Sequence, residues 1–360
     1  MRIIQLIDTL RSGGAERMAI NFAHVLTDEG IANALVVSRE DGIQSNRLPQ
    51  KTELTLLKKR SFYDFLAFIR VIKAIRAFQP DIVHAHSTSI FWALASRIFV
   101  GKVILIWHDH YGLSDQLKPG DRKLERILSR WMDGVVVVNK RLKRWIVEET
   151  KLDKRKVVMI PNFPHLMGDF NKDRTMGSPV ILLQLANFRR QKNHFRSLEA
   201  FNWLISEVDF QVELWLAGAT DLDPSYSIEV KKMIDNLGIG SQVKILGDGE
   251  NIEDLLRKAH IGILSSDSEG LPVSLLEYGL AGLPVVATQV GECSEVLQNG
   301  RYGKLVSSKD FQTFGKAIKS LIENYSNSAI LGNELKFHVE ISYGAKGFLN
   351  KYLSFFEAIK

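Results

Sequence analysis

The residues with the most evident chemical potential lie in one segment of the second half of the chain, Ser265–Gly279, which reads SSDSEGLPVSLLEYG. A short apolar run ends at Ser265, and a helix is predicted to begin near Pro272, because proline is favoured in the first turn of a helix. Glu269 and Glu277 are eight residues apart, about two helical turns, so we expect them on the same side of the structure. A buried Glu277 carboxylate could accept hydrogen bonds from the two adjacent hydroxyls of a ribose. A solvated Glu277 with a helix-capping Glu269 is the alternative interpretation.

A second segment, LANFRRQKNH, concentrates positive charge after a predicted strand and before a predicted helix. It contains Arg189, Arg190 and Lys192. Cations directed at a cleft suit a diphosphate, whose negative charge grows as it leaves. A solvated basic loop is the other interpretation, and the position directly after a strand argues against it.

Two features of the first half could also contact a ligand. Gly13-Gly14 lies between a predicted strand and a helix, where glycines let backbone N–H groups approach a phosphate. A tight turn that needs glycine explains the pair equally well, and the spacing matches neither the dinucleotide fingerprint nor the Walker loop. His108 ends one predicted strand, and His84 and His86 end the preceding one. Such histidines could face a cleft and bind a sugar or transfer a proton, or they could be structural. We predict no metal site, because no acidic or thiol partner accompanies them at a suitable spacing.

These segments need elements that position them, and short β-branched runs alternate with amphipathic stretches along the whole chain. Apolar runs without polar alternation predict buried parallel strands, and the stretches between them predict covering helices. The predicted strands are 2–8, 33–38, 81–86, 103–108, 134–139, 180–186, 211–218, 242–246, 261–265 and 284–287. The predicted helices are 15–29, 65–78, 195–206, 227–237, 252–258 and 271–280, with a helical tail over 310–360.

The strand–helix pattern occurs twice, once on each side of a polar stretch near residues 161–178. The sequence therefore predicts an α/β protein with two doubly wound, Rossmann-like domains that face each other across a cleft, where ligands bind at the carboxyl ends of the strands. We expect an N-terminal domain at 1–164, a linker at 165–178, a C-terminal domain at 179–340, and a last helix at 341–360 that packs back towards the N-terminal domain.

The composition excludes several classes of protein. The chain has 360 residues, of which 45% are hydrophobic and 24% charged, the balance of a globular protein. A single cysteine, Cys293, excludes a disulfide framework and predicts a reducing, cytoplasmic compartment. No apolar run approaches the length of a membrane span, and the first residues lack the layout of a cleaved signal.

Charge is unevenly distributed between the two halves. Residues 1–165 carry 27 Lys and Arg against 17 Asp and Glu, a net charge of +10, whereas residues 166–360 carry 20 against 24. The basic first half predicts an anionic partner, such as a lipid surface or a phosphate-bearing substrate. Nucleic acid is the weakest candidate, since no zinc-finger, RNP or helix-turn-helix signature is present.

Taken in order, these motifs resemble those of the family 4 (group 1) glycosyltransferases, which are retaining, nucleotide-sugar-dependent enzymes with the two-domain GT-B fold. The resemblance rests on the Glu-x7-Glu segment SDSEGLPVSLLEYGLAGLPVVAT, and it runs nearly end to end. The other matching pieces are GGAER at 13–17, DIVHAH at 81–86, His108, IPN at 160–162, the Lys192 loop and Gly291-Glu292 leading to Glu295.

The resemblance implies a role for each matching residue. The backbone of Gly13 and Gly14 would contact the diphosphate or the donor sugar, and His108 would hydrogen-bond the sugar. Lys192, with an arginine of its loop, would neutralise the diphosphate. The remaining roles fall to the Glu-x7-Glu segment: Glu269 with the N–H groups of Gly270 and Leu271 would hold sugar hydroxyls and phosphate, and Glu277 would bind the ribose.

The chain departs from the family pattern at two places. Most members have Gly-Arg where this chain has Ala186-Asn187. Asn187 thus stands in place of the family's arginine, and we expect Arg189, or failing that Arg190, to take over its role. Tyr278-Gly279 stands where alanine-rich sequence is usual. The resemblance further implies retention at the anomeric carbon, with electrostatic stabilisation of the leaving diphosphate and no metal or other cofactor.

The acceptor is predicted from a basic, amphipathic stretch in the first half. Lys58-Lys59-Arg60 and Phe62 precede the predicted helix 65–78, in which Arg70, Lys73 and Arg76 recur at three-residue intervals. Such a helix could lie on an anionic membrane, or it could be an ordinary domain helix with one core face. The membrane interpretation predicts a glycan or polyprenyl-linked acceptor at the inner face of the cell membrane.

The sequence therefore favours a glycosyltransferase of cell-surface glycan synthesis, with a UDP-sugar as the expected donor. A nucleotide-sugar epimerase on the same fold and a non-catalytic nucleotide-sugar-binding scaffold remain alternatives. A phosphorylase would need a pyridoxal-binding lysine context that the sequence lacks.

Overall fold

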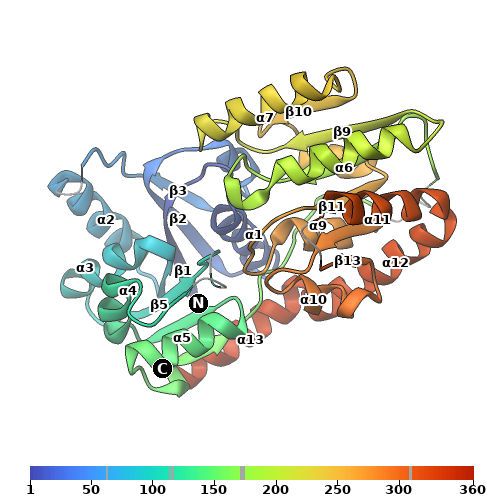
Figure 1. Ribbon diagram of the computed structural model, residues 1–360. Coiled ribbons are helices and arrows are strands. Elements are labelled where there is room, and N and C mark those ends of the chain that lie inside the picture. Colours follow the sequence, from blue (N-terminus) through green and yellow to red (C-terminus); the bar gives the residue numbers. More distant parts are fainter. Residues whose placement is uncertain (62–63, 113, 115–116, 171–174, 308–309) are drawn as a thin grey trace. The chain divides into compact units, whose positions relative to one another are not determined.

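The computed structural model describes residues 1–61, 64–112, 114, 117–170, 175–307 and 310–360 (Figure 1). Phe62 and part of the expected linker, 171–174, lie outside the described residues. The chain divides into two compact units, Met1–Phe163 with Gly344–Lys360, and Pro164–Tyr343. The first unit thus takes its last helix from the C-terminal end of the chain.

The described part of the first unit is built on a parallel sheet with the order β3-β2-β1-β4-β5-β6-β7. Register pairs such as Gln5↔His84 and His86↔His108 align polar residues of neighbouring strands. The strands are β1 (Arg2–Thr9), β2 (Ala32–Glu40), β3 (Glu53–Leu56), β4 (Ile82–His86), β5 (Ile104–Asp109), β6 (Gly134–Val137) and β7 (Val157–Met159).

Helices cover both faces of this sheet, so its strands are apolar on both sides. One face packs on α2, α3 and α5 through a core that includes Val83, Leu105 and Val135. The other face packs on α1 and α13 through Phe22 and Phe348. The helices are α1 (Gly14–Asp28), α2 (Phe65–Phe78), α3 (Ile90–Val100), α4 (Lys123–Leu128), α5 (Lys140–Thr150) and α13 (Ala345–Ile359), with 3₁₀ turns η1 (Ile43–Arg47), η2 (Ser87–Ser89), η4 (Ser129–Trp131) and η5 (Lys154–Lys156).

The second unit repeats this design with a parallel sheet of order β10-β9-β8-β11-β12-β13 in its described residues. Its strands are β8 (Val180–Leu185), β9 (Val212–Ala217), β10 (Val243–Gly247), β11 (Ile261–Leu264), β12 (Val285–Thr288) and β13 (Lys304–Val306). Its helices are α6 (His194–Ser206), α7 (Pro224–Leu237), α8 (Ile252–Lys258), α9 (Val273–Leu280), α10 (Cys293–Val296), α11 (Phe311–Glu323) and α12 (Tyr325–Ser342), with 3₁₀ turns η6 (Arg190–Lys192) and η7 (Gln298–Gly300).

Side-chain caps fix where several helices begin. Asp64 accepts a hydrogen bond from the N–H of Ala67 at the start of α2, and Asp223 accepts one from Tyr226 at the start of α7. Such caps satisfy N–H groups that the first helical turn leaves without a partner.

The α/β class with two doubly wound parallel sheets is confirmed, and every predicted strand is present. Three strands escaped prediction: β3, β7 and β13, each of only three or four residues. They lie at sheet edges, where a short run carries little hydrophobic signal. Among the described residues, none of the helices combines the length and apolar character that crossing a lipid bilayer requires.

Candidate functional site

Both sheets place candidate residues where the direction of winding reverses. In the first unit the reversal lies between β1 and β4, and in the second between β8 and β11. Open α/β sheets bind ligands outside the carboxyl ends of the strands at this point, because adjacent loops there diverge to opposite faces. Gly13 and Gly14 follow β1, the Lys192 loop follows β8, and Glu269 follows β11.

Lys192 and Glu269 form an ion pair across the reversal point of the second unit. The Lys192 Nζ lies 2.6 Å from Oε1 of Glu269, and the Ser266 hydroxyl donates to the same oxygen at 2.6 Å. The Lys192 side chain is 21% exposed and that of Glu269 is 7% exposed. An ammonium has three donors, so Glu269 aims Lys192 while leaving it N–H groups for an anionic ligand.

The two arginines of the loop differ in what they contact. Arg190 forms a bidentate ion pair with Glu229 of α7, at 2.5 and 3.0 Å. Arg189 is exposed, and no ion pair joins it to another residue in the described part of the chain. Asn187 accepts a hydrogen bond from the N–H of Ala219 at 3.0 Å, which ties two loops together. Arg190 is therefore paired with α7, whereas Arg189 is exposed.

Arg196 of α6 is a member of this region that sequence reasoning missed. It is 5% exposed, donates to the carbonyl of Ser265 at 2.5 Å, and pairs with Asp267 at 2.6 Å. Asp267 also accepts from Asn193 at 3.0 Å. Arg196 therefore holds the loop that carries Glu269. An arginine two residues into a helix that follows a basic loop was the available signal.

Glu277 lies in α9, in the helix predicted to carry it, and is 3% exposed. Its neighbour Tyr278 is fully buried. The Tyr278 hydroxyl accepts from the N–H of Leu185 at 2.6 Å and donates to the carbonyl of Leu183 at 3.1 Å. Its ring occupies the space against Gly262. Tyr278 thus ties α9 to β8, which explains how the chain accommodates a tyrosine where alanine is usual.

Gly270 and Leu271 form the turn between Glu269 and α9, and both are buried. Their backbone packs against the loop at Gly291, where a Cβ would lie 2.2 Å from the carbonyl oxygen of Glu269. Gly291 also has a φ of +51°, a conformation that side chains disfavour. Glycine at 291 therefore lets the two loops approach, and the N–H of Glu292 donates to the carbonyl of Gly270 at 2.9 Å.

The glycine pair of the first unit does not form a turn that requires glycine. Gly13 caps α1 with an extended backbone, φ −174°, which any residue can adopt, and Gly14 does not have a positive φ. A Cβ on Gly14 would meet no atom within 4 Å, and one on Gly13 would meet the Glu16 carboxylate. The space beside Gly14 is therefore open, whereas the Glu16 carboxylate occupies the space beside Gly13.

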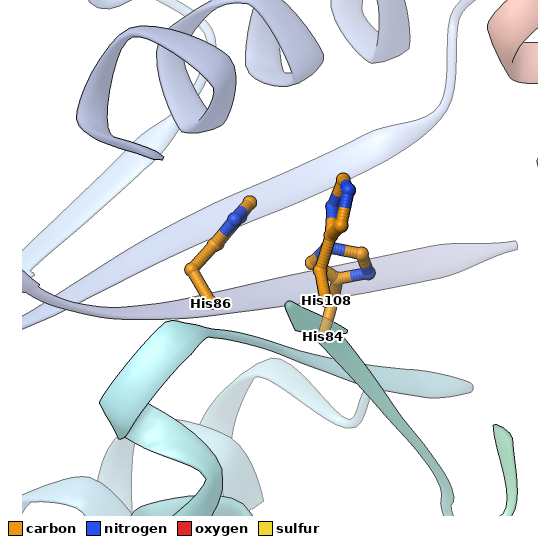
Figure 2. A group of neighbouring side chains, drawn as sticks. All are labelled: His84, His86 and His108. Atoms are coloured by element: carbon orange, nitrogen blue, oxygen red, sulfur yellow. The ribbon is translucent and has the colours of Figure 1, made fainter. Parts of the chain in front are cut away.

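His108 belongs to a cluster of four histidines on one face of the first sheet. His84 and His86 lie on β4, His108 on β5, and His110 just beyond β5. Figure 2 shows that the first three project from neighbouring strands to the same side. Their side chains face α1 and α13, and those of His84, His86 and His108 are at most 1% exposed. The sequence pattern His-x-His, present twice, was the signal for one shared face.

Burial keeps these imidazoles uncharged. It lowers the pKa of His84 and of His110 to about 3. Repulsion from a protonated His110 adds to the shift at His84, and a hydrogen bond with Asn162 opposes the shift at His110. Burial also places the pKa values of His86 and His108 well below the usual 6.5. The cluster is therefore neutral at physiological pH.

Within the described residues, three of these histidines, His84, His86 and His108, form the group whose spacing could suit a metal ion. One nitrogen each from His84, His86 and His108 lies within 4.8 Å of the other two. Both nitrogens of His84 and both of His86 take part in hydrogen bonds, however, with Tyr352 and Gln5 among the partners. A metal would have to break those bonds.

Two family models match almost the whole chain. The model for glycosyl transferases group 1 matches residues 169–336, and that for glycosyltransferase family 4 matches residues 12–165. This chain belongs to the group 1 glycosyltransferases. The boundary between the two matches falls where the second unit begins.

Curated relatives of this glycosyltransferase are distant, and several are named for undecaprenol-linked or polysaccharide substrates. An Escherichia coli UDP-Gal:α-D-GlcNAc-diphosphoundecaprenol α-1,3-galactosyltransferase is 22% identical, over 88% of this chain and 86% of that protein. A Campylobacter jejuni α-1,4-N-acetyl-D-galactosaminyltransferase acting on a PP-undecaprenol-linked glycan is 23% identical, over 93% of each. The exopolysaccharide phosphotransferase of Streptomyces coelicolor is 25% identical over 78% of this chain, but the match spans only 28% of its length.

Solved structures agree on the GT-B fold. HepE of Anabaena in complex with UDP-glucose superposes with a TM-score of 0.80 at 17% identity, covering 99% of this chain and all of that one. TarM superposes with a TM-score of 0.78 at 12% identity, covering 99% and 98%. The expected GT-B architecture is confirmed.

Proposed function

We propose that the enzyme transfers a hexosyl group from a UDP-sugar to a polyprenyl-diphosphate-linked or other glycan acceptor during synthesis of a cell-surface polysaccharide. The observation that carries the proposal is the Lys192–Glu269 pair at the carboxyl ends of β8 and β11, at 2.6 Å. Relatives named for undecaprenol-linked acceptors and a structural neighbour with UDP-glucose bound support the donor and acceptor classes.

In this proposal the second unit binds the nucleotide. Lys192 and Arg189 neutralise the diphosphate, whose charge grows as the sugar–phosphate bond breaks. Preorganised cations are worth most at the moment when charge develops. Glu277 accepts the hydroxyls of the ribose, and the N–H groups of Gly270 and Leu271 contact phosphate. Asn187 and Arg190 hold the loop, since each already has a protein partner.

The first unit contributes uncharged donors. N–H groups at Gly13 and Gly14 face the diphosphate or the sugar, and His108 hydrogen-bonds the sugar. We propose that transfer proceeds with retention at the anomeric carbon and without a metal or other cofactor. The paired cations supply the charge stabilisation that a divalent ion would otherwise provide.

A transfer assay tests the function. The purified enzyme is incubated with a labelled UDP-hexose and an undecaprenyl-diphosphate-linked glycan, with and without EDTA, and the anomeric configuration of the product is read by NMR. We expect acceptor-dependent transfer of an α-linked sugar from an α-donor, unchanged by EDTA. Inversion would contradict the retaining mechanism, and a strict Mg²⁺ or Mn²⁺ requirement would contradict the metal-free one. Conversion of the donor without acceptor would indicate an epimerase.

The acceptor proposal is supported by an exposed apolar surface on the first unit. One side of α2 enters the core through Val71, Ile72 and Ile75, as in an ordinary domain helix. Its first turn stays exposed, and the Phe68 ring contacts both Phe65 and Phe99, with centroids 6.3 and 5.5 Å apart. The exposed apolar residues of α2, α3, α4 and η4 are Phe65, Leu66, Ile98, Phe99, Leu124, Ile127 and Trp131.

Cations accompany this apolar surface. Arg70 and Lys73 of α2 and Arg97 of α3 are exposed, and Arg97 donates to the carbonyl of Trp131 at 2.7 Å. Apolar side chains among exposed cations suit an anionic lipid surface. We therefore propose that the enzyme works in the cytoplasm, at the inner face of the membrane, where a lipid-linked acceptor would be held.

Vesicle sedimentation tests the membrane proposal with a matched pair of variants. Ile98 and Ile341 are equally exposed, at 83%, but Ile341 lies in α12 of the second unit. We expect binding to vesicles rich in phosphatidylglycerol, release in high salt, and weaker binding of Ile98→Ser than of Ile341→Ser. Equal binding of the two variants, or no dependence on anionic lipid, would contradict the proposal.

A further inference from the structure

A chain of hydrogen bonds joins the C-terminal helix to His108. The hydroxyl of Tyr352 in α13 lies 2.8 Å from Nδ1 of His84. Nε2 of His84 lies 3.2 Å from Nδ1 of His108. Nε2 of His108 is buried and has no hydrogen-bond partner among the described protein atoms. The chain of bonds therefore ends at a nitrogen whose hydrogen-bonding capacity no described residue uses.

A neutral imidazole has one proton, so each bond fixes the next. If Tyr352 donates to Nδ1 of His84, the proton of His84 is on Nε2 and is donated to Nδ1 of His108. The proton of His108 must then be on Nε2. If Tyr352 accepts instead, every proton reverses, and Nε2 of His108 becomes a bare acceptor.

Counting unsatisfied groups decides between the two directions. When Tyr352 donates, the single unsatisfied group is the N–H at Nε2 of His108. When Tyr352 accepts, both the hydroxyl hydrogen of Tyr352 and the lone pair at Nε2 of His108 are left over, since His84 is the hydrogen-bond partner of the fully buried Tyr352 hydroxyl. Each buried polar group left without a partner lowers stability, so the first direction is more stable.

A second chain of bonds in the same cluster has a direction that is fixed independently. The Gln5 amide donates to the carbonyl of Ala19 at 3.2 Å, which turns its oxygen towards Nε2 of His86 at 2.8 Å. His86 must therefore have its proton on Nε2, and its Nδ1 accepts from Nε2 of His110 at 3.0 Å. The direction of this second set of bonds is fixed because a backbone carbonyl can only accept. The first set ends at the Tyr352 hydroxyl, which can either donate or accept.

We infer that Tyr352 and His84 are positioning residues that hold His108 as the Nε2–H tautomer, and so make it a hydrogen-bond donor to the transferred sugar. The consequence for catalysis rests on the proposed function, whereas the tautomer itself does not. A fixed N–H group can donate to a hydroxyl, N-acetyl carbonyl or carboxylate oxygen at the position it contacts. It disfavours a protonated amino group, which can only donate.

Histidine-labelled NMR tests the inference directly on the full chain. Two-bond ¹⁵N–¹H correlations distinguish protonated from bare ring nitrogens, and single His→Gln variants at 84, 86 and 108 assign the signals. In the wild type we expect a protonated Nε2 and a bare Nδ1 on both His108 and His86. A proton on Nδ1 of His108 would overturn the inference without any variant being needed. So would a metal that remains after purification and shifts the signals of His84, His86 and His108 together.

Tyr352→Phe then isolates the hydroxyl, since the ring that packs on Phe22 and Phe348 is kept. We expect His108 to become a mixture of tautomers while His86 is unchanged. Tyr325→Phe is the matched control, because it removes a tyrosine hydroxyl that donates to the carbonyl of His260 in the second unit. An unchanged His108 in folded Tyr352→Phe would overturn the role of Tyr352. If that variant fails to fold, the wild-type tautomer still decides the direction of the chain.

Steady-state kinetics of Tyr352→Phe distinguish a positioning role of Tyr352 from a purely structural one. Loss of the fixed donor should lower kcat about tenfold, the scale of one hydrogen bond, with the acceptor KM unchanged. A Tyr352→Phe variant with an altered tautomer and unchanged kcat would overturn the catalytic consequence. An inactive wild-type protein with the expected tautomers would count against the proposed function and leave the chain of bonds intact.

Discussion

The two units carry the same fold but place opposite kinds of chemistry at their reversal points. The first unit presents a buried cluster of neutral histidines that hydrogen-bond one another, and its charged groups there are the carboxylates of Asp8 and Glu16. The second presents charges, with the Lys192–Glu269 and Arg196–Asp267 ion pairs lining its loops. Neutral, oriented donors suit the hydroxyls of a sugar, and cations suit a diphosphate. The two units thus repeat one architecture with different electrostatics at the same topological position.

The largest expected effect comes from removing the cation of the second unit. Lys192→Ala should lower kcat/KM about 100- to 1000-fold, the loss typical of one preorganised charge-stabilising group. Lys244→Ala is the matched control, because Lys244 pairs with Glu213 at 2.8 Å near the amino ends of β10 and β9. Steady-state kinetics should show less than a twofold change for Lys244→Ala. Similar losses of kcat/KM in both variants would mean that activity depends on the overall positive charge of the unit and not on the position of Lys192.

As the pH falls, the first unit should lose stability at a higher pH than the second. Burial lowers the pKa of His84 to about 3, while an unfolded histidine titrates near 6.5, so the unfolded state takes up the extra proton as the pH falls below 6.5. Stability is therefore complete above pH 6.5 and is lost towards pH 3. His84 alone should cost about 2 kcal/mol between pH 7 and pH 5, and His86 and His108 shift in the same direction.

Hydrogen exchange measures this difference within one sample. Peptides from β4 and β5 should lose protection between pH 7 and pH 5, after correction for the intrinsic rate, while those from β8 and β11 change less. The second unit is not entirely insensitive, since burial also lowers the pKa of His194 to about 4. Equal loss in both units would contradict the contrast between a neutral and a charged site.

The two loop arginines should have unequal effects. Arg189→Ala should weaken the binding of a UDP-sugar about tenfold, because its guanidinium is expected to reach the diphosphate. Arg190→Ala should change it less than twofold, since Arg190 is paired with Glu229. Calorimetric titration of both variants measures the difference. A greater loss for Arg190→Ala would show that the Glu229 pair opens when the donor binds.

The smallest effect is expected at the glycine pair. Gly14→Ala fills open space at the start of α1, so it should leave the melting temperature unchanged and reduce kcat/KM about threefold by hindering the approach of the ligand. Gly347→Ala, at an equally open position in α13, should leave kcat/KM unchanged and raise the melting temperature slightly, because alanine is favoured over glycine in a helix. Full activity in Gly14→Ala would remove Gly14 from the site.

The charged site was more predictable than the neutral one, for a physical reason. Glu269 and Glu277 are fixed by one continuous strand–turn–helix segment, so their spacing in the sequence predicts their place. Tyr352 meets His84 only after 268 residues of chain, and a contact at that separation depends on which helix covers which face of the sheet. His84 carries no local sign that its partner lies in the last helix.

Arg196 and Tyr278 illustrate a second limit. Each was visible in the sequence, but their roles depend on contacts between elements: Arg196 with the loop after β11, and Tyr278 with the backbone of β8. Helix periodicity predicts that such residues are buried, and it does not predict which carbonyl or N–H they meet. The short edge strands β3, β7 and β13 were missed for a related reason, since pairing with a neighbour defines them more than their own composition.

Thermal unfolding with nucleotide sugars tests the central claim, that the second unit binds the donor through its charged loops and Glu277. Wild type, Glu277→Ala and the control Glu213→Ala are heated with UDP-, GDP- and ADP-sugars, because a ligand that binds only the folded state raises the melting temperature. We expect stabilisation by UDP-sugars in the wild type and in Glu213→Ala, and little in Glu277→Ala. Stabilisation of equal size in Glu277→Ala, or none by any nucleotide sugar in the wild type, would contradict it.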